Sequence, residues 1–426
     1  MKKSMKIAVA ALVAFVILGT WAVGFAIAEA DKTSSAEASS AVVQAQTLSS
    51  GTALASGTAL ASGTVTAGTP IYDKSELFSD RDLQQTADLT EAVTYAVADG
   101  QDITITEAGV YVLTGQAKDV TVYVAADKED KVQLVLDGLA ITNGDAPAIY
   151  VKSADKVFVT TAGDSALAVT GAFLSDGDTH TDGVIFSKSD LVLNGTATLT
   201  VTSSENGIVG KDDLKITGGT YRVSAQSKTI EANDSIRIAD GVFELTAGTD
   251  GLHAENDDDD TTGYIYLGGG TFTIQAGDDG LHATAVIQVD DGQLTIAAAE
   301  GIEATYVQLN GGTIAISSWD DGINAAQKSK AYRATVEING GDITIAMGAG
   351  DTDGVDSNGD ILINGGTVSV TGNSTFDYNG TGTITGGTVI VNGQQVTTLP
   401  NQMMGGRGGF GGGWGGNGGF GGRRGW

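Results

Sequence analysis

Two copies of one short sequence motif place an acidic residue and a histidine at matching positions. Residues 247–256 read AGTDGLHAEN, and residues 276–284 read AGDDGLHAT. The chain has 3 His residues, and His253 and His282 stand in these two copies. Carboxylates bind hard cations, and imidazoles bind metals or carry protons near neutral pH. If the fold brings the two motifs together, their side chains could bind a cation or transfer a proton.

The motifs belong to a longer repeat of glycine turns, each followed by a short strand pattern such as GGTYRVSA, DGVFELTA, GGTFTIQA or GGTIAISS. The second glycines recur at intervals of 20–29 residues: Gly219, Gly241, Gly270, Gly292, Gly312, Gly341, Gly366 and Gly387. A period of about 20–25 residues that carries three short strands is typical of one coil of a parallel β-helix. Propeller blades have longer periods, and sandwiches do not repeat this closely. The repeat predicts an all-β protein with a right-handed parallel β-helix.

Stacked coils would place equivalent residues in columns. In the motif D-G-[ILV]-x-A, alternation along a strand turns the aliphatic residue and Ala inward and x outward. The outward x positions, called here the central column, are Val209, Glu231, His253, His282, Glu303, Asn324 and Asp356. The residues just before this strand, called the acid column, are Asp182, Asn206, Asp250, Asp279, Glu300, Asp321 and Asp353, and Asp278 and Asp320 double the acid at two coils.

The acid column predicts a cation. Stacked strands lie about 4.8 Å apart, and two like charges at that separation repel by roughly 3.5 kcal/mol at an effective dielectric constant near 20. Because Ca²⁺–oxygen distances are about 2.3–2.6 Å, one ion can contact carboxylates of adjacent coils. Oxygen donors dominate, so we expect Ca²⁺ rather than Zn²⁺, held by Asp182, Asp250, Asp278, Asp279, Glu300, Asp320, Asp321 and Asp353. The alternative is that each Asp-Gly only forms a turn.

Composition limits the partners and suggests the location. The formal net charge of −29 argues against nucleic acid, and no Cys is available for disulfides or thiolate metal sites. Residues 1–30, with Lys2, Lys3 and an apolar run, predict an export signal, or alternatively an uncleaved membrane anchor. We therefore expect a secreted protein, with association to the cell surface as a further option. A Ser/Thr/Ala/Gly-rich linker at 31–70, a β-helix at 71–402 and a Gly/aromatic-rich disordered tail at 403–426 follow.

The sequence also resembles a known family. The stretches KVQLVLDGLAITNGDAPAIYVKSADKVFVT and DLVLNGTATLTVTSSENGIVGKDDLKITGGTYRVSA, among others over roughly residues 100–395, are similar to secreted clostridial carbohydrate-binding β-helix proteins. The resemblance implies calcium, binding of cellulose-like glycans and polygalacturonate, and a fold akin to family 9 pectate lyases. One departure matters: family copies carry Lys at x, where this chain has Glu231 and His253, although Lys211 remains in NGIVGKD.

Three functions follow from these patterns. The favoured one is a non-catalytic, calcium-dependent protein that binds plant cell-wall polysaccharide, with cell-wall association as a consequence. Its glycan contacts would be Glu231, His253, His282, Glu303, Asn324, Asp356, Trp319 and Tyr306, the aromatic rings stacking on sugars. A pectate-lyase-like enzyme is the alternative, with Lys211 as base and His253 or His282 as substitutes. A surface spacer or adhesin without glycan specificity is the third.

Overall fold

The computed structural model describes residues 67–256, 258–349 and 352–402. The predicted leader (1–30), nearly all of the linker (31–70) and the tail (403–426) lie outside the described residues. The one helix among the described residues is α1 (Lys74–Leu77). In this part of the chain no helix is long and apolar enough to cross a membrane.

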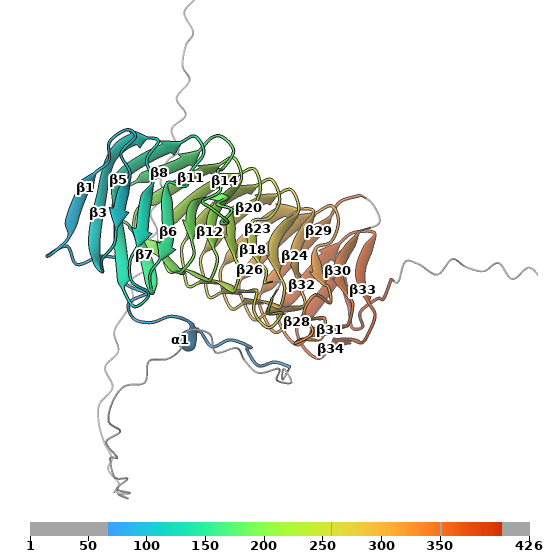
Figure 1. Cartoon of the computed structure of the whole chain (residues 1–426). Coiled ribbons are helices and arrows are strands. Elements are labelled where there is room, and N and C mark those ends of the chain that lie inside the picture. The colour runs from blue at the N-terminus through green and yellow to red at the C-terminus, as the bar shows by residue number, and fades with distance from the viewer. Residues whose placement is uncertain (1–66, 257, 350–351, 403–426) are drawn as a thin grey trace, which may run out of the picture. The chain divides into compact units, whose positions relative to one another are not determined.

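One coil of three strands is the repeating unit, and Figure 1 shows the coils stacked one after another. Each strand pairs in parallel with the equivalent strand of the next coil, as β12 does with β15, β13 with β16 and β14 with β17. The prediction of a parallel β-helix is therefore confirmed. The strands of these two coils are β12 (Asn206–Gly210), β13 (Asp213–Ile216), β14 (Thr220–Ala225), β15 (Ile230–Ala232), β16 (Ser235–Ile238) and β17 (Val242–Ala247).

The face that carries the central column is a sheet of 12 parallel strands among the described residues, called here the column sheet. Besides β12 and β15 it contains β2 (Ile103–Ile105), β4 (Val122–Ala125), β6 (Ile149–Ser153), β9 (Gly183–Ser187), β18 (Leu252–Ala254), β21 (Asp279–Ala283), β24 (Glu300–Ala304), β27 (Ile323–Ala325), β30 (Asp353–Ser357) and β33 (Ser374–Tyr378).

The other two faces form one continuous sheet, because the long strands β3 (Gly109–Lys118) and β5 (Lys131–Asn143) run through the corner between them. The face next in each coil contains β1 (Val93–Ala96), β7 (Lys156–Thr161), β10 (Asp190–Gly195), β13, β16, β19 (Tyr264–Leu267), β22 (Val286–Val289), β25 (Tyr306–Leu309), β28 (Thr335–Ile338), β31 (Asp360–Ile363) and β34 (Gly382–Ile384). The last face contains β8 (Ser165–Val169), β11 (Thr198–Ser203), β14, β17, β20 (Thr271–Ala276), β23 (Gln293–Ala298), β26 (Thr313–Ser318), β29 (Asp342–Met347), β32 (Thr367–Thr371), β35 (Thr388–Val391) and the antiparallel β36 (Gln394–Val396).

Columns of stacked aliphatic side chains fill the core. Ile230, Leu252 and Leu281 stack in successive coils and are fully buried. Burial of each such side chain is worth roughly 1.5–3 kcal/mol. The glycine turns let the coils approach: Gly270 has φ +105°, and a Cβ there would lie 3.0 Å from the Gly241 carbonyl oxygen. The repeated glycines thus set the coil spacing that aligns the columns.

The segment 67–92 crosses the face formed by β13, β16 and their successors. The backbone N–H of Tyr72 donates to Oε1 of Gln288 at 2.8 Å, and that of Ile71 donates to Oε1 of Gln308 at 3.1 Å. Ten residues further on, the buried Asp82 carboxylate lies 3.2 Å from Lys215 Nζ and 3.7 Å from Lys156 Nζ. This segment therefore covers one face of the β-helix, and its hydrogen bonds and ion pairs go to that face rather than to the column sheet.

Replacing Asp82 by Ala should lower the free energy of unfolding by about 3 kcal/mol, because it leaves buried Lys215 without its anionic partner. Chemical denaturation of both proteins measures this loss, and limited proteolysis should show faster cleavage within 67–92. The exposed Asp80 supplies the control, since D80A should match the parent chain. Equal stability of D82A and D80A would mean that the pair does not anchor the segment.

Candidate functional site

The register brings the central column together. Glu231 pairs with His253, His253 with His282, His282 with Glu303, and Asn324 lies between Glu303 and Asp356. The preceding inward residues, such as Leu252 and Leu281, face the core as the motif requires. The column is longer than the motif indicates and runs through Tyr123, Tyr150, Phe186, Val209, Glu231, His253, His282, Glu303, Asn324, Asp356 and Asp377.

The acid column follows the register with one correction. The backbone N–H of Asp279 donates to Asp250 Oδ1 at 3.2 Å, and that of Asp353 donates to Asp321 Oδ1 at 3.1 Å. Asp182 is one residue out of line, because Ile185 rather than Val184 stacks on Ile208 in the core and Gly183 consequently pairs with Asn206. The doubling residues Asp278 and Asp320 are exposed, one residue before the column.

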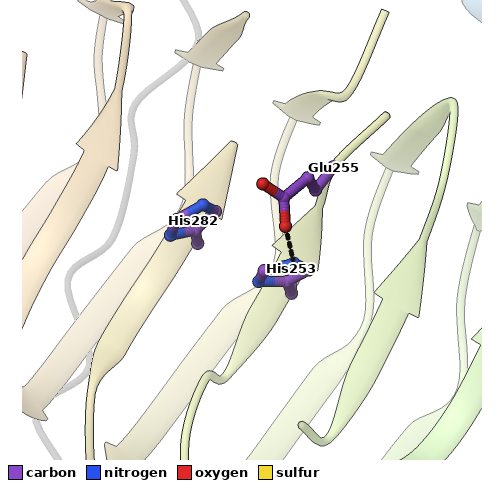
Figure 2. Close-up of side chains that lie close together, drawn as sticks. All are labelled: His253, Glu255 and His282. Carbon is purple, nitrogen blue, oxygen red and sulfur yellow. Dashed lines mark hydrogen bonds and ion pairs between the residues drawn. The ribbon is translucent and has the colours of Figure 1, made fainter. Parts of the chain in front are cut away.

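The two histidines stack in adjacent strands, as Figure 2 shows. Their ring centroids lie 4.6 Å apart, with 17° between the planes. Nδ1 of His253 lies 2.8 Å from Asp250 Oδ2, and Nδ1 of His282 lies 2.5 Å from Asp279 Oδ2. The residues are only 5% and 9% exposed, so they do not form a freely exposed stack. Although burial lowers the pKa of His282, its hydrogen bonds to Asp279 and Glu303 outweigh burial and raise that pKa to about 9.

Cations balance the acids beside the histidines. Lys211 Nζ lies 3.1 Å from Glu231 Oε1, and Lys228 Nζ lies 3.6 Å from Glu231 Oε2. Burial alone would raise the pKa of Glu231, but the two ammonium groups outweigh it and lower that pKa. On the other side, Lys328 Nζ lies 2.9 Å from Glu303 Oε2. Lys211, the candidate lyase base, is therefore held in an ion pair with Glu231.

Among the described residues, no lysine, arginine or histidine forms an ion pair with Glu300, Asp321, Asp356 or Asp377. Burial and the neighbouring carboxylates of Glu303 and Asp279 raise the pKa of Glu300 to about 8. Burial and the carboxylates of Asp356 and Asp353 raise the pKa of Asp321 to about 7. Burial and the carboxylates of Asp377 and Asp353 raise the pKa of Asp356 to about 6. We call these five residues the acidic end: Glu300, Asp321, Asp353, Asp356 and Asp377.

The acidic end has the donors that Ca²⁺ requires. All of its ligand atoms would be oxygens, which hard divalent cations prefer. Asn324 lies among them in the register, and its Nδ2 donates to Glu300 Oε2 at 3.0 Å. Its Oδ1 is buried and, among the described residues, has no hydrogen-bond donor. A cation beside this oxygen would satisfy it and would favour the ionised carboxylates, so the residues fit the expected ion.

The two predicted sugar-stacking rings differ in accessibility. Tyr306 is wrong as a glycan contact, because it is only 5% exposed and packs beneath Tyr72 and Phe78 of the covering segment. Its hydroxyl donates to Glu337 Oε2 at 2.8 Å. Trp319 is 54% exposed and stands at the turn just before Asp320 and Asp321. Of these two rings, only that of Trp319 is accessible to a ligand.

Comparisons with known proteins show which family the chain belongs to. A family model described as carbohydrate-binding domain-containing protein matches residues 99–354. The chain belongs to this family. A carbohydrate-binding domain-containing protein of Acetivibrio thermocellus is 37% identical over 130 residues, which are 29% of this chain and 46% of that protein. The chain thus matches less than half of that relative's length. A solved polysaccharide lyase-like protein from C. thermocellum, a gadolinium derivative, is 27% identical, with 57% of this chain and 96% of that one covered and a TM-score of 0.45.

The motif search missed the aromatic start of the central column. Tyr123, Tyr150 and Phe186 form successive ring contacts at 5.9 and 5.5 Å, and Lys152 Nζ lies 4.7 Å from the Tyr123 ring centroid. The coils of Tyr123 and Tyr150 lack the D-G motif, and in the coil of Phe186 the motif is one residue out of register, so the only available signal was the alternation in IYVKS and GVIFS. Glu255 was also missed: its Oε2 lies 3.1 Å from His253 Nε2, and nothing in the repeat singles it out.

In chelator, the melting temperature should fall as pH rises from about 5 to 9. A carboxyl whose pKa is raised on folding binds its proton more tightly in the folded state, so stability is lost between its ordinary pKa and its folded pKa. For Glu300 that window ends near pH 8, and His282, with its pKa raised to about 9, acts in the same direction. The lowered groups, such as Glu255 with a pKa of about 2, complete their contribution below this window.

The substitution E300Q should flatten this profile and raise the melting temperature at pH 8 by roughly 1–3 °C in chelator. The exposed Glu129, on the turn before β5, provides the matched control E129Q. Scanning calorimetry over the pH series measures both variants. A parent profile that is flat, or an E300Q profile parallel to it, would contradict the assignment of repulsion to Glu300.

Proposed function

We propose that the chain is an extracellular, non-catalytic protein that binds an acidic plant cell-wall polysaccharide of the polygalacturonate type through Ca²⁺ at the acidic end. Membership of the carbohydrate-binding family supports the ligand class. The observation that carries the proposal is the row of partly buried carboxylates of Glu300, Asp321 and Asp356 on the column sheet, which have no ion-pair partner among the described residues and whose pKa values are raised.

The charge balance explains why an ion is needed. The protein carries a formal net charge of −29, and polygalacturonate is itself a polyanion, so direct contact would be repulsive. Ca²⁺ prefers six to eight oxygen ligands, and a partly filled coordination shell at the surface can accept sugar carboxylates and hydroxyls. The regular coil spacing offers further polar contacts along the column sheet, so that several sugar units share the binding energy.

Retention on immobilised polygalacturonate should require Ca²⁺ and the acidic end. Replacing both Asp321 and Asp356 by Asn should weaken Ca²⁺ binding and glycan retention by roughly tenfold or more, equivalent to a loss of about 1.4 kcal/mol. Calorimetric titration with Ca²⁺ and affinity electrophoresis with and without chelator measure the two effects. The control D342N changes an exposed carboxylate on the last face and should leave both unchanged. Retention that survives chelator would refute the calcium bridge, and binding to no plant glycan would favour the spacer function.

The ring of Trp319 should contribute to the same site by stacking on a sugar. Replacing Trp319 by Ala should weaken glycan binding by roughly 3- to 10-fold, because aromatic stacking is worth about 0.5–1.5 kcal/mol. The Ca²⁺ affinity should stay unchanged, since the indole offers no ligand oxygen. Leu174, which is 63% exposed in a different coil, supplies the control L174A. Equal glycan affinity for W319A and L174A would remove Trp319 from the binding surface.

A calcium-dependent lyase is the competing function. Incubation with the same polysaccharide distinguishes it, because only a lyase would cleave the ligand. A lyase must abstract a proton from the uronate ring with a neutral base. The ion pair between Lys211 and Glu231 works against that role. Prolonged incubation with polygalacturonate should therefore yield no unsaturated uronate. Accumulation of that product in the parent chain, with its loss in K211A, would establish the enzyme instead.

A further inference from the structure

A second cluster on the column sheet contains nitrogen donors and lies next to the acidic end, since Asp279 pairs with Glu300 of the following coil. One ligand atom each of His253, Glu255 and His282 lies within 4.8 Å of the others, and the three come from or directly follow the adjacent strands β18 and β21 (Figure 2). Nδ1 of His282 forms a hydrogen bond with Asp279 Oδ2, and Nδ1 of His253 lies 2.8 Å from Asp250 Oδ2 without the geometry of a hydrogen bond. The remaining ligand atom of each imidazole is therefore Nε2.

The Nε2 atom of His282 supplies an independent sign of a missing partner. This atom is inaccessible to solvent and has no hydrogen-bond partner among the described residues, although the His282 residue is only 9% exposed. A buried ring nitrogen without a partner is costly, because it loses water and gains nothing in return. The equivalent atom of His253 lies 3.1 Å from Glu255 Oε2, so a carboxylate is already present beside the pair.

We propose that His253, His282 and Glu255 form a binding site for a divalent transition ion of the Zn²⁺ type. Two imidazoles and one carboxylate are a common zinc donor set when a fourth position is left for water or another ligand. Nitrogen donors also separate this site from Ca²⁺, which takes oxygen ligands. The side chain of Glu255 is 47% exposed, so the fourth position would open toward the surface.

The groups around the histidines support metal binding. A metal-bound imidazole commonly donates its other N–H to a carboxylate, which fixes the ring and raises its basicity. Asp279 occupies that position for His282, and Asp250 Oδ2 lies 2.8 Å from Nδ1 of His253 at the equivalent place in its coil. Glu303 adds a further carboxylate, with its Oε2 3.1 Å from His282 Nδ1.

Binding would require a small inward movement. Zinc–nitrogen distances are about 2.0–2.1 Å, so tetrahedral ligand atoms stand roughly 3.3 Å apart. The stacked rings therefore tilt toward each other, and the half-exposed Glu255 follows on its flexible stem. Cationic groups nearby are already paired: Lys211 and Lys228 contact Glu231, and Lys328 contacts Glu303. The ion would thus enter an environment in which the neighbouring lysines are already balanced by glutamates.

Calorimetric titration of the full chain with ZnCl₂ tests the site, after chelator treatment and with excess Ca²⁺ to fill the acidic end. We expect one Zn²⁺ per chain, and a visible absorption band when Co²⁺ is used instead. H253Q and H282Q should each weaken binding by roughly 100-fold or more, while D279N, which alters only the supporting carboxylate, should weaken it by roughly 10- to 100-fold. The exposed third histidine supplies the control, since H180Q should bind like the parent chain.

Two results would overturn the proposal: no Zn²⁺ binding by the parent chain, or equal affinity in the parent chain, H253Q and H282Q. If a histidine variant does not fold, E255Q decides, because its half-exposed side chain tolerates substitution and the charge loss alone should weaken Zn²⁺ binding. Neither result bears on calcium-dependent glycan binding, which is tested separately by replacing both Asp321 and Asp356. The two proposals therefore fail separately.

Discussion

The spacing between coils is the constraint on which the rest of the structure depends. Parallel pairing puts the same position of every coil about 4.8 Å from its neighbours. Any residue type that the repeat favours must therefore coexist with copies of itself. Apolar residues gain from this arrangement, and the Ile230–Leu252–Leu281 column shows the result. Charged residues of one sign repel their copies in the neighbouring coils unless each coil also supplies a group of opposite charge.

The central column meets this constraint in a different way in each region. At its start, aromatic rings of Tyr123, Tyr150 and Phe186 contact one another. In the middle, Lys211 neutralises Glu231, and each histidine takes an aspartate three residues earlier in its own coil. At the acidic end no such cation is supplied by the described residues around Asp321 and Asp356, and their pKa values rise instead. We therefore expect the functional site at the acidic end, where the carboxylates are not fully neutralised by cationic side chains.

The sequence was sufficient for the fold and for the columns because both follow from local periodicity. The glycine period predicts the coils, and strand alternation predicts which side of β18 and β21 carries His253 and His282. It failed where one coil departs from the motif: Asp182 is displaced because Ile185 occupies the core position opposite Ile208. In this coil, the packing of the core residue rather than the position of the Asp-Gly motif decides the register.

Contacts between distant parts of the chain were beyond the reach of such reasoning. Tyr306 looks like an outward ring in its own repeat, and only the segment that brings Tyr72 across the same face buries it. The burial of the histidines has a similar origin, since neighbouring coils cover an outward side chain that a single strand would leave exposed. Glu255 matters only because its backbone follows His253 directly and turns its carboxylate back over the ring.

A single column can therefore hold two kinds of electrostatic environment a few coils apart. Around the histidines, the acids Glu231 and Glu303 are paired with lysines, and Nδ1 of each imidazole lies beside an aspartate. At the acidic end, oxygen donors repel one another and retain protons until a cation enters, so ionisation and ion binding are linked. The two environments differ in the residue at x and in whether a lysine from a neighbouring turn reaches it. Glu303, paired with Lys328, and Asp356, which faces Asp377, show this difference.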